Sequence, residues 1–225
     1  PLMAMDTVKR TVEYARSLEK EHNKVFRFTI TTNGVLLNDE TIEYINQEMS
    51  NVVLSLDGRQ PVNDRMRPTV KGKGSYEVIV PKFQKLVAGR GTKDYYVRGT
   101  FTRDNLDFSQ DVLHMGDLGF RHVSVEPASG PLDDPFAIKE EDLEKVEAEY
   151  EKLAGQLMER PDINFFHFNV DLAQGPCVIK RLRGCGAGCE YVAITPDGDI
   201  YPCHQFVGKE EYRMGNVFDG SFDMD

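Results

Sequence analysis

The sequence lacks an excess of positive charge. Its 27 Lys and Arg residues are outnumbered by 37 Asp and Glu residues, which gives a formal net charge of −10 at pH 7. Proteins that hold the phosphate backbone of nucleic acids rely on clustered Lys and Arg, which release counterions on binding. We therefore expect no nucleic-acid partner.

Long apolar runs are also missing. The run from Asn51 to Leu56 is far shorter than the roughly 20 residues that cross a bilayer, and nothing near the start is typical of a secretion signal. The composition, 40% hydrophobic and 28% charged, is that of a folded globular chain. The sequence predicts a cytoplasmic protein with no membrane partner.

Cysteine is absent from the first 176 residues, and all four cysteines then fall within 27 positions. They are Cys177, Cys185, Cys189 and Cys203. Such clustering favours a local metal site over scattered core cysteines, and in the cytoplasm it favours metal over a disulfide knot. No pair has the Cys-x-x-Cys spacing of many structural zinc sites, which weakens zinc without excluding it. Thiolates presented from glycine-rich turns also suit an iron–sulfur cluster, whereas free, reduced cysteines are the less favoured reading.

Helical and strand patterns alternate along the first 170 residues. Helices are expected at 6–23, 39–49, 75–88, 107–118 and 139–158, and strands at 25–31, 52–56, 95–102, 122–125 and 163–168. Serial βα units require a parallel sheet with right-handed crossovers. We predict an α/β fold whose strands are buried on both faces.

The composition changes after Asp171. Glycines and the cysteines crowd together there, and two short alternating runs are joined by Pro196-Asp197-Gly198, which is typical of a β-hairpin. We predict an α/β domain at 1–170 and a small Cys-rich annex at 171–225.

Polar side chains follow several expected strands. Asn33, Ser55, Asp57 and Arg98 stand at positions where parallel α/β barrels place their ligand-binding loops. Ser55 and Asp57 suit hydrogen bonds to a ligand, and Arg98 suits a carboxylate. Each signal alone is weak, because Asn-Gly after a strand is usually only a turn and a strand-end Arg is usually only surface.

Several stretches together resemble radical S-adenosylmethionine (SAM) enzymes that carry a SPASM domain. They are Thr31–Gly34, Leu54–Gly58, Asn63–Pro68 and, most distinctively, Gly184–Gly208 followed by Met214–Asn216. The resemblance covers nearly the whole chain. It is greatest to the maturases that install thioether cross-links in the cysteine-rich peptides called SCIFF.

The resemblance implies a partial radical SAM (β/α) barrel of parallel strands, followed by a SPASM-like annex. In the annex, Cys177, Cys185 and Cys203 would be ligands of an auxiliary 4Fe-4S cluster, with Cys189 a possible ligand only. The fourth ligand stays open.

The resemblance also implies a SAM site in the barrel. Pro1 looks like the end of the family's Gly-Gly-Glu-Pro motif, and Ser55 and Arg98 match strand ends that touch the SAM ribose and carboxylate. Asn33 and Asp57 lie beside them. No catalytic residue is assigned.

The chain departs from the family pattern at both ends. The Cys-x-x-x-Cys-x-x-Cys loop of the SAM-cleaving cluster, the first barrel strand and the later SPASM cysteines are not in this sequence. Both ends resemble cuts, and we expect the piece to be inactive by itself.

For the complete protein, the resemblance implies thioether formation in a Cys-rich precursor peptide by way of a 5′-deoxyadenosyl radical, with ferredoxin or flavodoxin as electron donor. One alternative is an anaerobic sulfatase-maturating enzyme, which makes formylglycine. His204 stands where that group carries an aspartate, which argues against it. The non-enzymatic alternative is a zinc-stapled binding module.

Overall fold

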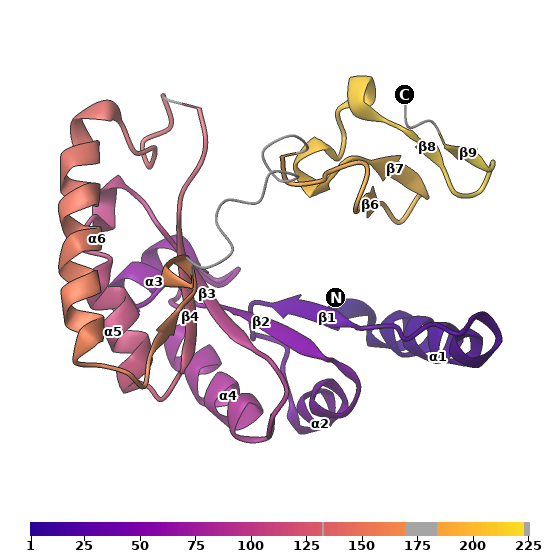
Figure 1. The fold of residues 1–225 in the computed structure, drawn as a ribbon, viewed down its shortest axis with the longest axis horizontal. Coiled ribbons are helices and arrows are strands. Elements are labelled where there is room, and N and C mark those ends of the chain that lie inside the picture. Colours follow the sequence, from indigo (N-terminus) through magenta and orange to yellow (C-terminus); the bar gives the residue numbers. More distant parts are fainter. Residues whose placement is uncertain (132, 170–183, 223–225) are drawn as a thin grey trace. The chain divides into compact units, whose positions relative to one another are not determined.

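The computed structural model describes residues 1–131, 133–169 and 184–222. The chain divides into two compact units, Pro1–Asn169 and Val170–Asp225 (Figure 1). Cys177 lies outside the described residues, so its predicted role as a cluster ligand has no structural counterpart here.

The first unit is built on a five-stranded parallel sheet. Its strands are β1 (Thr29–Thr32), β2 (Asn51–Ser55), β3 (Tyr96–Phe101), β4 (His122–Pro127) and β5 (Asn164–Phe165). They lie in sequence order, and every neighbouring pair is parallel. Sequential order without a reversal is the arrangement of a barrel wall rather than of a doubly wound sheet. The predicted α/β fold with parallel strands is confirmed.

Helices connect the strands. They are α1 (Met5–His22), α2 (Asp39–Glu48), α3 (Gln60–Met66), α4 (Tyr76–Ala88), α5 (Ser109–Asp117) and α6 (Leu143–Met158). Short 3-10 turns occur at Leu2–Ala4, Arg103–Asn105, Glu140–Asp142, Phe166–Phe168, His204–Phe206 and Glu210–Tyr212. The sequence did not predict α3, because seven residues are too few to show a helical period. In the described part of the chain, no helix combines the length and apolar character needed to cross a membrane.

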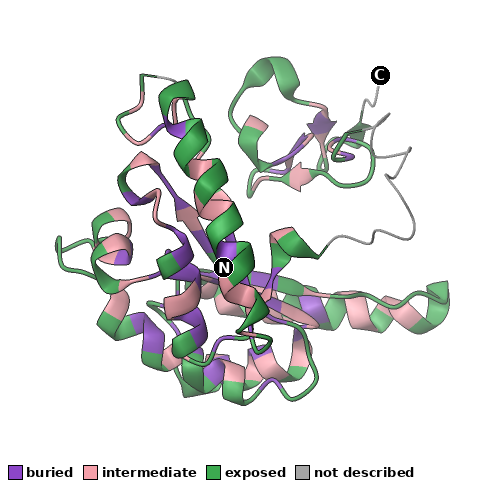
Figure 2. Ribbon diagram, turned by 60° about the vertical axis from the view of Figure 1, so that its left-hand side comes forward, coloured by how far each residue is buried: buried purple, intermediate pink, exposed green. Residues whose placement is uncertain are grey.

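One face of the sheet is buried, and the other is partly exposed. Buried and exposed residues alternate along the ribbon (Figure 2). In the sheet, Val52 and Leu54 are fully buried, whereas Ser55, Arg98 and Glu126 on the other face remain partly or fully exposed. The core therefore lies between the sheet and its helices, with large buried side chains from the helices, among them Ile45, Phe83, Met115 and Leu153. The prediction of strands buried on both faces holds only in the middle of β4, where Val123, Ser124 and Val125 are all buried. Along β1, β2 and β3 burial alternates, because the described helices cover one face of the sheet.

Gly99 in β3 permits a close approach of the backbone that follows β2. A Cβ at this position would lie 2.5 Å from the Leu56 carbonyl oxygen and 2.9 Å from the Asp57 Cα. Both contacts are with backbone, which cannot move aside as a flexible side chain can. The end of β2 is thus held against β3 at the level where polar residues begin.

We expect Gly99→Ala to lower the free energy of unfolding by about 1–3 kcal/mol through this overpacking. Urea denaturation followed by circular dichroism measures the change. Gly155→Ala is the matched control, since a Cβ on Gly155 in α6 meets nothing within 4 Å and helical Ala is favoured over Gly. Equal stability of the two variants would contradict the proposed close packing.

The second unit carries a small antiparallel sheet. Its strands are β6 (Ala193–Ile194), β7 (Asp199–Tyr201), β8 (Gly215–Asn216) and β9 (Ser221–Phe222), in that order. The predicted hairpin is confirmed, with Ala193 opposite Tyr201 and a turn in which Gly198 has a φ of 87°. The sequence did not predict β8 and β9, because two-residue strands show no alternation.

Candidate functional site

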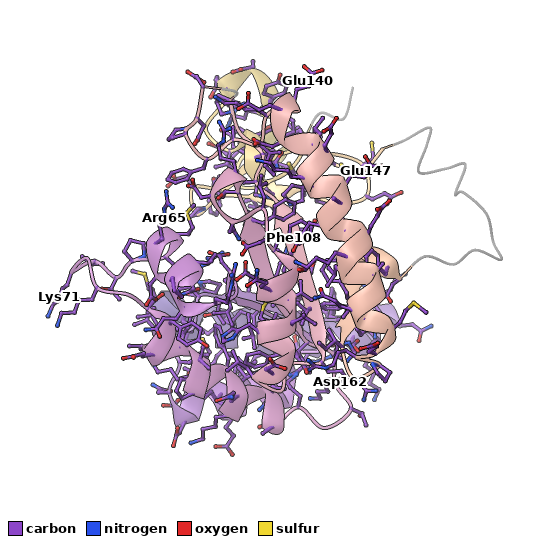
Figure 3. All side chains as sticks on the ribbon, turned by 90° about the vertical axis from the view of Figure 1, so that its left-hand side faces the viewer. Arg65, Lys71, Phe108, Glu140, Glu147 and Asp162 are labelled. Carbon is purple, nitrogen blue, oxygen red and sulfur yellow. The ribbon has the colours of Figure 1, made fainter. Side chains whose placement is uncertain are left out.

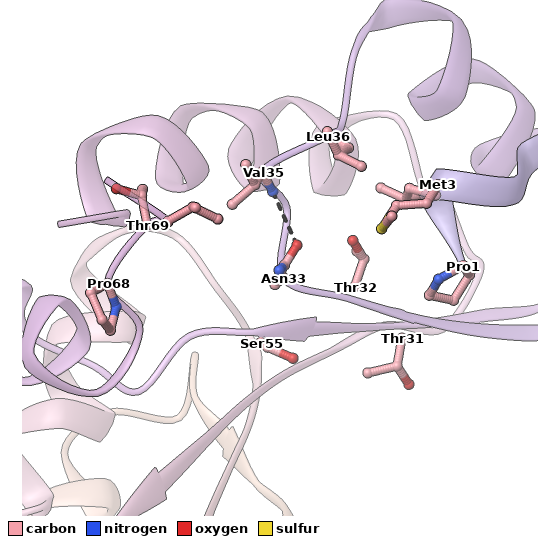
Figure 4. Close-up of a pocket in the computed structure, with 12 residues that line it drawn as sticks. Pro1, Met3, Thr31, Thr32, Asn33, Val35, Leu36, Ser55, Pro68 and Thr69 are labelled. Carbon is pink, nitrogen blue, oxygen red and sulfur yellow. Dashed lines mark hydrogen bonds between the residues drawn. The ribbon is translucent and has the colours of Figure 1, made fainter. Parts of the chain in front are cut away.

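A pocket of about 470 Å³ lies beside the carboxyl ends of β1 and β2 (Figure 4). It is lined by Pro1, Leu2, Met3, Thr31, Thr32, Asn33, Val35, Leu36, Ser55, Pro68, Thr69 and Val70. Its volume falls in the usual range of small-molecule sites. Three of the five residues predicted to bind the cofactor, Pro1, Asn33 and Ser55, therefore line one pocket.

Local hydrogen bonds shape the turn that bears Asn33. The Thr32 hydroxyl accepts from the Gly34 N–H at 3.1 Å, and Asn33 Oδ1 accepts from the Val35 N–H at 3.3 Å. Gly34 has a φ of 79°, and a Cβ there would lie 2.4 Å from the Phe83 ring. The Asn-Gly pair is thus a turn, as its sequence suggests, and the same turn sets Asn33 in the pocket wall.

Arg98 lies one strand away from the pocket. It is paired in register with Ser55 on one side and Ser124 on the other, so all three lie on the same face of the sheet. The Arg98 side chain is 59% exposed, and its Nε lies 4.0 Å from Glu126 Oε1. Arg98 is not among the residues that line the pocket, and its contact with a ligand stays a prediction.

Asp57 lies below the surface rather than in the pocket lining. It is 2% exposed, and its carboxylate accepts two hydrogen bonds from the Arg67 guanidinium, at 2.7 and 2.9 Å. The Thr100 N–H donates a third at 3.0 Å. The structure therefore presents Asp57 as an anchor for Arg67, and its direct contact with a ligand also stays a prediction.

A row of hydrogen-bonded side chains at the end of β4 was not predicted from the sequence. Glu126 Oε1 accepts from the Ser124 hydroxyl at 2.6 Å, and Glu126 Oε2 lies 2.8 Å from His167 Nε2. His167 Nδ1 lies 2.9 Å from the Tyr150 hydroxyl. When Nε2 carries the imidazole proton, it donates to Glu126 while Nδ1 accepts from Tyr150. Glu126 itself was recognisable as a strand-end carboxylate, but His167 and Tyr150 lie 41 and 24 residues from it in the sequence and carry no motif.

These hydrogen bonds keep Glu126 ionised. Burial opposes its ionisation, but the hydrogen bonds from Ser124 and His167 outweigh that effect and hold the pKa of the carboxyl below its usual value. Burial in turn raises the pKa of the Tyr150 hydroxyl. The partly exposed face of the sheet therefore bears a fixed anion beside the Arg98 cation.

Backbone turns present the cysteines of the second unit. Gly184 and Gly186, with φ of 61° and 79°, flank Cys185. The Gly188 N–H lies 3.0 Å from the Pro202 carbonyl oxygen, which ties the Cys185 loop to the segment just before Cys203. The two cysteines thus lie on adjoining segments.

The Cys185 sulfur accepts two hydrogen bonds. A hydrogen bond from the Ala187 N–H and another from the Tyr191 hydroxyl, whose oxygen lies 3.6 Å from Sγ, lower the pKa of the Cys185 thiol. Hydrogen bonds to sulfur are among the protein contacts that tune iron–sulfur clusters. Cys185 and Cys189 are exposed, Cys203 is buried, and none of the three is in a disulfide. This donor set fits an iron–sulfur cluster.

No three His, Cys, Asp or Glu side chains in the described ranges converge closely enough to hold a metal ion. With Cys177 outside those ranges, the convergence of Cys177, Cys185 and Cys203 on one centre stays a prediction. The same holds for Cys189 as a possible ligand.

Residues 185–224 match the SPASM family, an iron–sulfur cluster-binding domain. The chain is 22% identical over 233 residues to the cysteine-type anaerobic sulfatase-maturating enzyme of Clostridium novyi (strain NT), with 98% of this chain and 60% of the relative covered. It is 30% identical over 223 residues to the mycofactocin maturase MftC of Mycobacterium ulcerans (strain Agy99), with 94% and 55% covered.

A solved structure has the same fold. "Native anSMEcpe with bound AdoMet and Kp18Cys peptide" matches with a TM-score of 0.74 at 15% identity, covering 94% of this chain and 61% of that one. The chain thus spans little more than half the length of these relatives. It is a relative of the radical SAM enzymes that carry a SPASM domain, with their α/β fold and, from residue 185, a unit of the SPASM iron–sulfur cluster-binding family.

Proposed function

We propose that the protein to which this chain belongs is a radical SAM peptide maturase that binds SAM in the pocket at the ends of β1 and β2. The observation that carries the proposal is the convergence of Pro1, Asn33 and Ser55 on that pocket, in a chain whose second unit matches the SPASM domain. The related anSMEcpe structure with bound AdoMet and peptide supports both ligand classes.

The chemistry of the pocket fits SAM. Hydroxyls of Thr31 and Ser55 and the amide of Asn33 suit the ribose and the charged groups, whereas Leu36 and Val70 offer apolar contact to the base. When bound, SAM would supply the radical that abstracts a hydrogen atom from the substrate. The residues of this chain would bind and orient it at the carboxyl edge of the sheet.

The proposed auxiliary 4Fe-4S cluster would be held by Cys177, Cys185 and Cys203, with Cys189 as a possible fourth ligand. Support comes from the SPASM match and from the donors that surround the Cys185 sulfur. The Tyr191 hydroxyl would remain as a hydrogen-bond donor to that ligand.

The finer proposal is thioether cross-linking of a Cys-rich precursor peptide, with ferredoxin or flavodoxin as electron donor. Its support is the resemblance of Gly184–Gly208 to the SCIFF maturases and the presence of His204 in place of aspartate. The second candidate is formylglycine formation, favoured by similarity to the Clostridium novyi enzyme over 98% of this chain.

Mass spectrometry separates the two candidates. The full-length reconstituted protein is incubated anaerobically with SAM, a reductant and either a Cys-rich peptide or a sulfatase-derived peptide. We expect the Cys-rich peptide to lose two hydrogens and one free thiol without gaining an aldehyde. A hydrazine-reactive aldehyde formed only on the sulfatase peptide would establish the second candidate, and 5′-deoxyadenosine release without any peptide product would reject both.

A further inference from the structure

The segment that closes one side of the pocket is fastened at Arg67. Pro68, Thr69 and Val70 line the pocket. Figure 4 shows Pro68 and Thr69 on the side away from Pro1. Arg67 precedes them. Its Nε donates to Asp57 Oδ2 at 2.7 Å, and its Nη2 donates to Asp57 Oδ1 at 2.9 Å. A bidentate arginine–carboxylate pair fixes direction as well as distance.

The rest of this segment is largely exposed and is held by hydrogen bonds within its own turn. A tight turn closes it, with the Thr69 N–H 2.7 Å from the Lys73 carbonyl oxygen. Val70 is fully exposed, a Cβ on Gly72 would meet nothing within 4 Å, and Lys71 projects from the tip (Figure 3). The position of the wall therefore depends on the anchors at its two ends.

Arg67 is held through both its main chain and its side chain, and only the side-chain contact involves Asp57. The Ser75 hydroxyl donates to the Arg67 carbonyl oxygen at 2.7 Å, while Arg67 itself is held by Asp57. Asp57 is in turn fixed to β3 by the Thr100 N–H, and the absence of a side chain on Gly99 permits this approach. The side chain of Arg67 thus ties the pocket wall to the sheet through one buried carboxylate, while its main chain is held by Ser75 and Asn63.

Asp57 is poorly placed to touch a ligand itself. Its Oδ1 accepts from Arg67 and Thr100, its Oδ2 accepts from Arg67, and the residue is 2% exposed. A ligand would have to displace these donors to reach it. The polar side chain with a direct path into the pocket from the same strand end is Ser55.

We propose that Asp57 is a positioning residue, which acts through Arg67 to hold Pro68–Val70 as the wall of the nucleotide pocket. The inference rests on the proposed function for the identity of the ligand, but not for the anchoring of the segment. It assigns to Asp57 an indirect role in place of the direct contact suggested by sequence.

A double-mutant cycle tests the indirect role. The full-length, cluster-loaded protein and its variants Asp57→Asn, Arg67→Met and the double variant are titrated with S-adenosylhomocysteine by calorimetry, and amide hydrogen exchange is followed at residues 69–74. We expect each single variant to bind about tenfold more weakly and to exchange faster in this segment, since a hydrogen bond to a charged group is lost. The double variant should be no weaker than either single one, because both changes break the same link.

Asp104→Asn is the matched control. It also removes an aspartate partner from an arginine, Arg65, at 2.7 Å, but that pair is exposed and does not anchor the pocket wall. Thermal unfolding identifies any variant that fails to fold. Arg67→Met removes the same ion pair by changing Arg67, which is more exposed than Asp57.

The outcomes are distinct. Additive losses of affinity, with exchange at 69–74 unchanged, would overturn the inference and return Asp57 to direct contact. Unchanged affinity in Asp57→Asn would overturn it as well. Wild-type protein that does not bind S-adenosylhomocysteine would reject the proposed function. Faster exchange at residues 69–74 in the variants would still support the role of Asp57 in holding the segment, and unchanged or slower exchange would overturn it.

Discussion

Replacing Cys185 or Cys203 by serine is expected to remove about four iron atoms and the matching sulfide per chain from the reconstituted full-length protein, since a 4Fe-4S cluster usually needs all its thiolates. The two cysteines lie on segments joined by the Gly188 to Pro202 hydrogen bond. The Cys185 sulfur also has its own backbone and Tyr191 donors. Iron and sulfide assays and the loss of the brown visible absorption measure the effect.

Cys189→Ser provides the comparison within the same loop. Cys189 is exposed, and the resemblance makes it only a possible ligand. If Cys189 does not bind the cluster, this variant keeps full iron content, whereas equal loss in all three variants would make it a ligand. Wild-type protein that stays colourless and holds zinc would contradict the iron–sulfur reading altogether and favour the zinc-stapled module.

Asp111→Ala is expected to lower the free energy of unfolding of the α/β unit by about 3 kcal/mol, which corresponds to a fall of roughly 10 °C in Tm. The Asp111 side chain is fully buried and accepts from the Arg59 N–H at 2.9 Å, from Arg59 Nε at 2.8 Å and from Asn105 Nδ2 at 3.2 Å. Asp111 and then Asp107 raise the pKa of Arg59 above its usual value. Removing Asp111 leaves part of a mostly buried cation unpaired.

The same change at Asp117 is the control for helix α5. Asp117 pairs with Arg160 at 2.9 Å, but its side chain is 67% exposed, and exposed ion pairs contribute about 0–1 kcal/mol. Asp117→Ala should therefore leave Tm nearly unchanged. A comparable loss in both variants would show that Asp111 stabilises the unit only as a helix residue.

Local pattern was enough to predict most elements. The expected helix at 39–49 is α2 at Asp39–Glu48, and the expected strand at 52–56 is β2 at Asn51–Ser55, because apolar spacing along a chain directly reflects which side is buried. Boundaries shifted where one segment holds two kinds of structure. The strand expected at 163–168 is only Asn164–Phe165, followed by a 3-10 turn at Phe166–Phe168.

The sequence by itself determined the alternation of helices and strands, the Pro-Asp-Gly hairpin and the crowding of cysteines, since each of these is written in residues close together in the chain. Only the tertiary structure decided that one sheet face stays partly exposed, that Asp57 holds Arg67, and that Glu126 meets His167 and Tyr150. These contacts join residues on different elements, so they depend on strand register and on the path of each crossover, which no local pattern specifies.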